Sequence, residues 1–174
     1  MRKTLVTVIV AIVAVALVFG LAYLLGFGIG KAVDAYSSQK EKTYSLEGLS
    51  ITLPGEFVKA RDNSITQAGN LATDDVSFVV IRDAQSFENY KDVAEYAVGF
   101  KEANRYEEEI KTENGYTLIE YYRTISGVNT QNTVVLLHGP DAFWVLRFSF
   151  DKALCEEYRP RIFEWLNTVT FETK

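Results

Sequence analysis

Residues 4–30 form an unbroken apolar run, TLVTVIVAIVAVALVFGLAYLLGFGIG, that contains no charged side chain. An α-helix of about 20 apolar residues is long enough to cross the hydrocarbon core of a bilayer. The pattern therefore predicts one N-terminal transmembrane helix over residues 4–30, which anchors the rest of the chain to the lipid bilayer.

Charged residues on either side of this run predict its orientation. Arg2 and Lys3 precede it, whereas Lys31 and Asp34 follow it and nearly cancel. Short segments rich in Lys and Arg stay on the cytoplasmic side of a membrane. We therefore expect a single-pass protein of the cell membrane, with residues 1–3 as a cytoplasmic tail and the C-terminal domain outside.

Two alternatives concern the same segment. A small-residue pattern ending at Ala35 would suit a cleaved signal peptide, but the apolar region of such peptides spans only about 7–15 residues, so an uncleaved anchor is favoured. Ala22, Gly26 and Gly30 recur every four residues, and this spacing lets two helices approach closely. A homodimer through that face is therefore an alternative, but the favoured interpretation is that the glycine-rich end of the helix only frays at the membrane surface.

Beyond the anchor, the pattern changes to that of a folded domain. Residues 31–43 are polar and small, so we interpret them as a linker and place one extracytoplasmic domain over residues 44–174. Residues 61–75 have little apolar content, and their pattern does not assign an element. Short β-branched or alternating segments bounded by turn residues predict strands over residues 45–46, 50–53, 76–82, 106–112, 116–124, 128–138, 142–150 and 168–171.

Four of these strands follow one another with short turns between them. Asn114 and Gly115 separate the first two, and this dipeptide is the strongest short signal for a β-hairpin. Gly139 and Pro140 lie between the last two strands. The spacing predicts a four-strand antiparallel meander over residues 106–150.

Two segments show helical periodicity instead. Tyr90, Val93, Ala97 and Phe100 recur at three- and four-residue steps after Ser86, which predicts a helix over residues 87–104 with Ser86 as its N-cap. A closing helix is predicted after the N-cap residue Asp151, on Leu154, Tyr158, Ile162 and Leu166, where Pro160 either kinks the helix or starts a second segment. The order of elements is that of an α+β fold, an antiparallel sheet packed against two helices.

Charge narrows the range of partners. The whole chain has a net charge of −5, and residues 43–174 hold thirteen Lys and Arg against twenty-one Asp and Glu, a net charge of −8. An acidic domain is repelled by nucleic acid and by anionic lipid surfaces. We therefore expect no nucleic-acid partner.

The elements also resemble a known family. The segments YSLEGLSITLPGEF, ENGYTLIEYY and FWVLRFSF, with the closing YRPRIFEWLNTVTF and the central helix, are similar to the PsbP-like superfamily, over residues 44–172. This resemblance implies an antiparallel sheet between helices and a binding or assembly module, seldom an enzyme. The family includes an extrinsic photosystem II subunit, but no residue here matches particular metal-binding or photosystem-docking residues.

Candidate chemistry is sparse. The single histidine, His138, ends a predicted strand, and the single cysteine, Cys155, lies in the closing helix without an activating motif. Neither Asp74 and Asp75 nor residues 107–109 show the alternation of oxygen ligands that a calcium loop needs. Phosphate loops, nucleophile elbows and zinc motifs are absent from the sequence. The sequence predicts no enzyme activity, no cofactor, no metal site and no catalytic residue.

Arg147 and Glu120 are the two remaining candidates, as a ligand contact or an ion pair. Arg147 lies within a strongly apolar strand and shares its face with Phe143, Val145 and Ser149. Its guanidinium must reach solvent, bind a ligand or pair with a carboxylate such as Glu120 across the sheet. The structural pair is favoured, and Glu120 and Arg123 are expected on opposite faces of their own strand.

The leading functional hypothesis is a membrane-tethered extracytoplasmic module that binds another envelope protein and is not catalytic. The tether would raise the local concentration of any membrane-bound partner. Two alternatives remain. One is an envelope domain that binds a small ligand between sheet and helices, and the other is a cryptic hydrolase.

Overall fold

The computed structural model describes residues 40–60, 68–125 and 127–172, apart from the side chain of residue 125. Within these ranges, no helix is both long and apolar enough to span a bilayer. The anchor predicted over residues 4–30, its dimer face of Ala22, Gly26 and Gly30, and the cleavage position near Ala35 lie outside the described residues.

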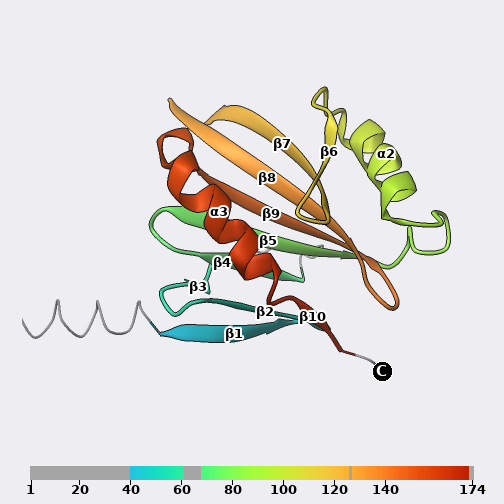
Figure 1. Ribbon diagram of the computed structural model, residues 1–174, viewed down its shortest axis with the longest axis horizontal. Coiled ribbons are helices and arrows are strands. Elements are labelled where there is room, and N and C mark those ends of the chain that lie inside the picture. The colour runs from blue at the N-terminus through green and yellow to red at the C-terminus, as the bar shows by residue number, and fades with distance from the viewer. Residues whose placement is uncertain (1–39, 61–67, 126, 173–174) are drawn as a thin grey trace, which may run out of the picture. The chain divides into compact units, whose positions relative to one another are not determined.

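The described residues form two antiparallel sheets and two α-helices (Figure 1). The smaller sheet has the strand order β1-β2-β10 and the larger one the order β3-β4-β5-β9-β8-β7-β6, so the predicted meander is confirmed as the run from β9 to β6. The bounds are β1 (Glu41–Leu46), β2 (Leu49–Pro54), β3 (Val58–Lys59), β4 (Gly69–Ala72), β5 (Val76–Asp83), α2 (Val93–Asn104), β6 (Ile110–Glu113), β7 (Tyr116–Ile125), β8 (Val128–His138), β9 (Phe143–Asp151), a 3₁₀ turn (Lys152–Leu154), α3 (Cys155–Leu166) and β10 (Thr170–Phe171).

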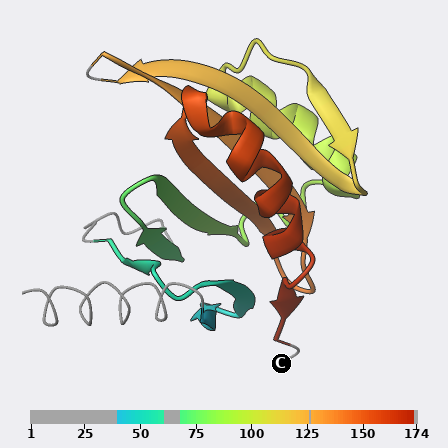
Figure 2. The same cartoon turned by 60° about the vertical axis from the view of Figure 1, so that its left-hand side comes forward.

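The central strands of the larger sheet are buried on both faces. In β9, Trp144, Leu146 and Phe148 pack into one cluster, whereas Phe143 and Val145 pack into another. Successive side chains of a strand point to opposite faces, so these clusters lie on the two sides of the sheet. Figure 2 shows α3 on one side and α2 on the other.

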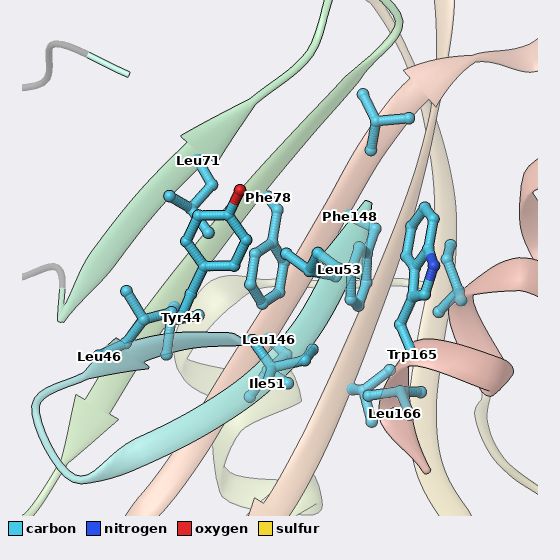
Figure 3. Close-up of a cluster of buried hydrophobic side chains, with 14 of the residues drawn as sticks. Tyr44, Leu46, Ile51, Leu53, Leu71, Phe78, Leu146, Phe148, Trp165 and Leu166 are labelled. Carbon is cyan, nitrogen blue, oxygen red and sulfur yellow. The ribbon is translucent and has the colours of Figure 1, made fainter. Parts of the chain in front are cut away.

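The larger cluster lies between the sheet, α3 and the β1–β2 hairpin (Figure 3). Phe78 and Phe148 stack with ring centroids 4.5 Å apart, and the ring of Trp165 from α3 lies 6.0 Å from Phe148. Leu53 and Ile51 from β2 close the cluster from the hairpin side. This is the apolar core that the sequence patterning requires.

The smaller cluster holds α2 against the opposite face. The ring of Tyr96 stacks on Phe143 with centroids 4.2 Å apart, and its hydroxyl donates a hydrogen bond to Oδ2 of Asp83 at 3.0 Å. Burial, reinforced by the Asp83 carboxylate, raises the pKa of Tyr96 well above its usual value. The hydroxyl is therefore a permanent donor that fixes the orientation of α2.

The predicted start of the first helix was wrong. The helix begins at Val93, not at residue 87, because Asp92 is the N-cap and accepts a hydrogen bond from the Glu95 amide at 2.9 Å. The Glu95 carboxylate also accepts from the Lys91 amide at 2.8 Å, which closes the first turn. Tyr90 still packs on the cluster, but from the turn that precedes the helix. Its apolar side chain therefore fitted the helical spacing in the sequence although it is not part of the helix.

Several strand boundaries also differ from the prediction. β1 begins at Glu41 and pairs with β2 along its whole length, so it includes three residues of the expected linker. β3 and β4 fall where little structure was expected, and β6 begins only at Ile110. The hairpin turn at Asn114 and Gly115 is confirmed, with φ of 49° and 82°, as a two-residue turn of this kind requires.

An ion-pair network fastens α3 to the sheet. Arg159 donates to Oε1 of Glu120 through Nε at 2.9 Å and also binds the Glu113 carboxylate through both terminal nitrogens. Lys111 completes the set with a contact of 3.1 Å to Glu120. α3 is one helix from Cys155 to Leu166 with Pro160 inside it, so the alternative that Pro160 starts a second segment was wrong.

The titration of Glu120 makes the contribution of this network to stability depend on pH. Burial alone would raise its pKa, but hydrogen bonds from Arg159 and Lys111 outweigh it and hold the pKa below the usual value. A carboxylate with a lowered folded-state pKa stabilises the fold fully above its unfolded pKa and loses that contribution as pH falls through the folded value.

We therefore predict that Glu120→Gln lowers the free energy of unfolding at pH 7 by about 1–2 kcal/mol. The difference from wild type should shrink as pH falls from about 4.3, the usual pKa of an unfolded Glu, through the lower pKa of the folded carboxylate. Urea unfolding at pH 7 and at acidic pH measures both values. A difference that stays constant with pH would show that the Glu120 charge contributes nothing.

The helix start generates a second prediction. Asp92→Ala should destabilise the protein by about 1 kcal/mol, because it removes the side-chain acceptor for the first turn of α2. The matched variant is Ser86→Ala, at the cap expected from the sequence, which should change stability by less than about 0.5 kcal/mol. Chemical unfolding measures the free energy of unfolding of both variants. Equal losses of stability would contradict the assignment of Asp92 as the N-cap.

Candidate functional site

The α2-side face of the larger sheet becomes polar beyond the end of the smaller cluster. There a groove with a volume of about 560 Å³ lies over β5, β7, β8 and β9, beside the turn at residues 73–75. We call it the arginine groove and define it by the side chains Ser77, Tyr121, Arg123, Asn132, Arg147 and Ser149.

Strand register arranges these side chains in three parallel rows. Val134 lies opposite Arg147 in the first row, at the border of the apolar cluster. The second row runs from Tyr121 through Asn132 and Ser149 to Ser77. The third row runs from Arg123 through Thr130 to Asp151. The two arginines therefore flank the polar middle row from opposite sides.

Hydrogen bonds fix the floor of the groove. The Ser149 hydroxyl donates to Oδ1 of Asn132 at 2.8 Å, and Nδ2 of Asn132 donates to the Thr130 carbonyl at 3.4 Å. Both side chains come from neighbouring strands of the rigid sheet. The floor is thus held in one arrangement by the fold.

The arginines themselves are held without carboxylates. The guanidinium of Arg123 lies over the Tyr121 ring, 5.0 Å from its centroid. Nε of Arg147 is buried and has no hydrogen-bond acceptor among the described residues. Nor does any carboxylate of the described chain form an ion pair with either arginine. A buried donor without an acceptor is costly, so an incoming acceptor would be favoured at Nε of Arg147.

Tyr106, in the loop after α2, packs on Tyr121 beside the groove. Its ring stacks on Tyr121 with centroids 4.8 Å apart. Burial, and then interaction with the Tyr121 hydroxyl, raises the pKa of Tyr106 to about 12, although Arg147 and Arg123 act in the opposite direction. The Tyr106 hydroxyl therefore stays protonated at neutral pH, within the field of both guanidinium groups.

Acidic side chains line the remaining side of the groove, and two of them have structural partners. Asp75 accepts a hydrogen bond from the Tyr158 hydroxyl at 3.3 Å, and Asp151 accepts one from the Ala153 amide at 2.9 Å. Asp74 is exposed beside them. The groove thus combines a basic centre with an acidic rim.

The structure does not bring the two predicted site residues together. Arg147 lies on the expected face with Phe143 and Val145, whereas Glu120 faces α3 on the opposite side of the sheet. The predicted pairing of Glu120 with Arg147 was therefore wrong. Glu120 lies on the α3 side of β7, and its partner there is Arg159. The expectation that Arg123 and Glu120 face opposite sides is confirmed.

Two other residues considered from the sequence lie apart. His138 ends β8, and its ring stacks on Phe143 at 5.0 Å in the α2-side cluster. Cys155 begins α3 and packs against the core on the other side. The described residues contain no group of three or more side chains that could hold a metal ion.

Two smaller cavities have their charged groups already engaged. One of about 440 Å³ contains Arg82, which pairs with Asp141 at 2.8 Å. The other, of about 360 Å³, is lined by Arg159, whose partners are Glu113 and Glu120. Of the three, the arginine groove is the largest and the one with unpaired cations in the described chain.

Sequence reasoning identified Arg147 but missed the rest of the groove. A signal was present, since β7, β8 and β9 each replace apolar by polar side chains at alternate positions near the same end. Only the register shows that Tyr121, Asn132 and Ser149 stand in one row.

Comparisons with known proteins bear on the fold. No protein-family model matches the chain, and no curated protein matches its sequence. A crystal structure of a protein from Bacteroides thetaiotaomicron VPI-5482 is similar over 79% of this chain, with 10% identity and a TM-score of 0.53, and this chain spans half of that protein's length. The solution structure of cyanobacterial PsbP (CyanoP) from Synechocystis sp. PCC 6803 is similar over 78% of this chain and 93% of CyanoP, with 11% identity and a TM-score of 0.50. The protein therefore has a PsbP-like fold.

Proposed function

We propose that this protein is a membrane-tethered extracytoplasmic binding module whose binding surface is the arginine groove. The tether rests on the uncharged run of residues 4–30 and the basic residues before it. The absence of nucleophile, metal and phosphate-loop motifs from the sequence favours a module that binds its partner without transforming it.

One observation carries the choice of surface. The sheet face that α2 covers ends in a concave polar region in which Arg147 is held without an acceptor from the described chain. Functional pockets commonly have volumes of roughly 300–1,000 Å³ and a few convergent polar groups. The arginine groove, at about 560 Å³, has both features.

The tether supplies a physical reason for attaching a module of this kind to a membrane. The segment between the predicted anchor and β1 comprises about ten residues, and a flexible chain of this length has an average extension of roughly 20 Å. The domain would then search a thin layer next to the bilayer. Its effective concentration toward a membrane-bound partner rises accordingly.

A small-ligand-binding domain is the second candidate, and the same groove favours it. Its floor is preformed by hydrogen bonds between neighbouring strands, which reduces the cost of ordering a small ligand. In this alternative the partner is a diffusible molecule, and the tether only sets the location of the domain.

Site-specific photo-crosslinking in native membranes tests the proposal. A benzophenone amino acid replaces Thr130 in the groove of the full-length protein, and Thr170 on the smaller sheet is the matched exposed control position. We expect a discrete adduct with another envelope protein from position 130 and not from position 170. Mass spectrometry of the purified adduct identifies the partner.

The opposite results are equally informative. Adducts of equal yield from both positions would remove the groove as the binding surface. Adducts only with a second copy of the chain would replace the heterologous partner by the homodimer that Gly26 and Gly30 suggest.

A further inference from the structure

Each of the two smaller cavities contains one arginine of the described chain, and each of these arginines has a carboxylate partner. Arg82 binds Asp141 at 2.8 Å, and Arg159 binds Glu113 and Glu120. Arg123 and Arg147 differ from them, since no ion pair joins either one to a carboxylate of the described chain. Among the arginines that line the three cavities, only these two have no ion pair within the described chain.

The register brings the two guanidinium groups toward the same floor. Arg147 lies on β9 in the first row and Arg123 on β7 in the third row, with the middle row of Asn132 and Ser149 between them. Arg123 leans onto Tyr121, which belongs to that middle row. The charge of Arg147 acts to lower the pKa of Tyr106, whose ring stacks on Tyr121. Both positive charges therefore act over one small area.

The surrounding groups are suited to oxygen atoms. The Ser77 hydroxyl lies in the middle row beside Ser149 and lines the groove. Nε of Arg147 is a buried donor without an acceptor in the described chain. A guanidinium fork matches two oxygens held in one plane, as in a carboxylate.

The acidic rim limits the size and charge of the ligand. Asp74, Asp75 and Asp151 line the groove beside the arginines. A polyanion or an anionic membrane surface would be repelled by this rim and by the net charge of −8 over residues 43–174. A single carboxylate carries less negative charge for this rim to repel.

We propose that the arginine groove binds a carboxylate group, held between the guanidinium groups of Arg123 and Arg147 above the floor of Asn132 and Ser149. This inference rests on the groove being the binding surface of the proposed function. The carboxylate belongs either to a free small molecule or to an acidic side chain or C-terminus of a partner protein.

The experiment uses the full-length protein in non-ionic detergent, with succinate as the probe. Succinate should raise the midpoint of thermal unfolding, because a ligand that binds only the folded state stabilises it. Uncharged succinamide of similar shape should have no effect, and sodium chloride at equal ionic strength controls for screening. Titration calorimetry gives the dissociation constant.

Substitutions assign the binding to the groove. Arg147→Gln and Arg123→Gln should each weaken succinate binding by about tenfold or more, since each removes a charge-assisted pair. Arg147→Lys keeps the charge but loses the planar fork, and should give an intermediate loss. Arg161→Gln, on α3 across the sheet, makes the same charge change and should leave binding unaltered. Arg123 lies on the groove surface, so its variant keeps the test decisive if Arg147→Gln fails to fold.

Competition with the photo-crosslink at position 130 distinguishes the two sources. If succinate suppresses a protein adduct, the carboxylate belongs to that partner. If succinate binding depends on the arginines but position 130 yields no protein adduct, the ligand is a free small molecule. In that case the carboxylate site stands, and only the protein partner of the proposed function is ruled out.

Other outcomes overturn the inference. Equal stabilisation by succinamide, or unchanged binding in Arg123→Gln, would show that the arginines do not hold a carboxylate. A response to inorganic phosphate without one to succinate would assign the groove to a different anion. A protein adduct that succinate does not displace, with no thermal response to succinate, would leave the proposed function intact and remove the carboxylate.

Discussion

The central strands of the larger sheet bury apolar side chains on both faces, and most of the fold follows from this constraint. Trp144, Leu146 and Phe148 point to one side of β9, and Phe143 and Val145 to the other. Each side chain of this size stabilises the fold by about 1.5–3 kcal/mol when it is removed from water. Both faces must therefore be covered, by α3 and the β1–β2 hairpin on one side and by α2 on the other (Figures 1 and 2).

The two covers differ in how they are attached. α3 brings Trp165 and Leu166 into the larger core and adds the Arg159 network at its exposed edge. α2 is fixed by stacking and by the hydrogen bond from Tyr96 to Asp83. A helix of twelve residues spans about 18 Å, so α2 covers only part of a sheet whose strands reach eleven residues.

The arginine groove is the consequence of that mismatch in length. Where α2 no longer covers the sheet, an apolar face would be exposed, and the strands carry polar side chains there instead. Serines and an asparagine would suffice to make this region soluble. Arg147 differs from them, because its Nε is buried without an acceptor in the described chain, and an incoming acceptor would remove the cost of this arrangement.

This arrangement also relates the fold to its proposed setting. The groove lies on elements of the larger sheet, whereas the chain enters the domain through β1 of the smaller sheet. The same PsbP-like fold supports a protein of quite different sequence in a cyanobacterium. Function in such a scaffold depends on the side chains grafted onto it, and the proposed site consists of the two arginines and the polar row between them.

Local patterns in the sequence determined much of this protein. The uncharged run of residues 4–30, the meander with its turn at Asn114 and Gly115, and the closing helix can all be read from short segments, because hydrophobic period and turn chemistry are local properties. The start of α2 was not readable, since Tyr90 satisfies the helical spacing from a turn. β3 and β4 were missed because their few residues carry no strong period.

Only the tertiary structure decided which side chains meet. Glu120 and Arg147 seemed suited to pair, but strand parity sends them to opposite faces, and Arg159, thirty-nine residues from Glu120, is the true partner. Tyr121, Asn132 and Ser149 form one row through pairing between strands, and register is set by the whole buried sheet rather than by any one strand. The sequence alone thus determined the elements and the chemistry available to them, whereas long-range pairing decided the site.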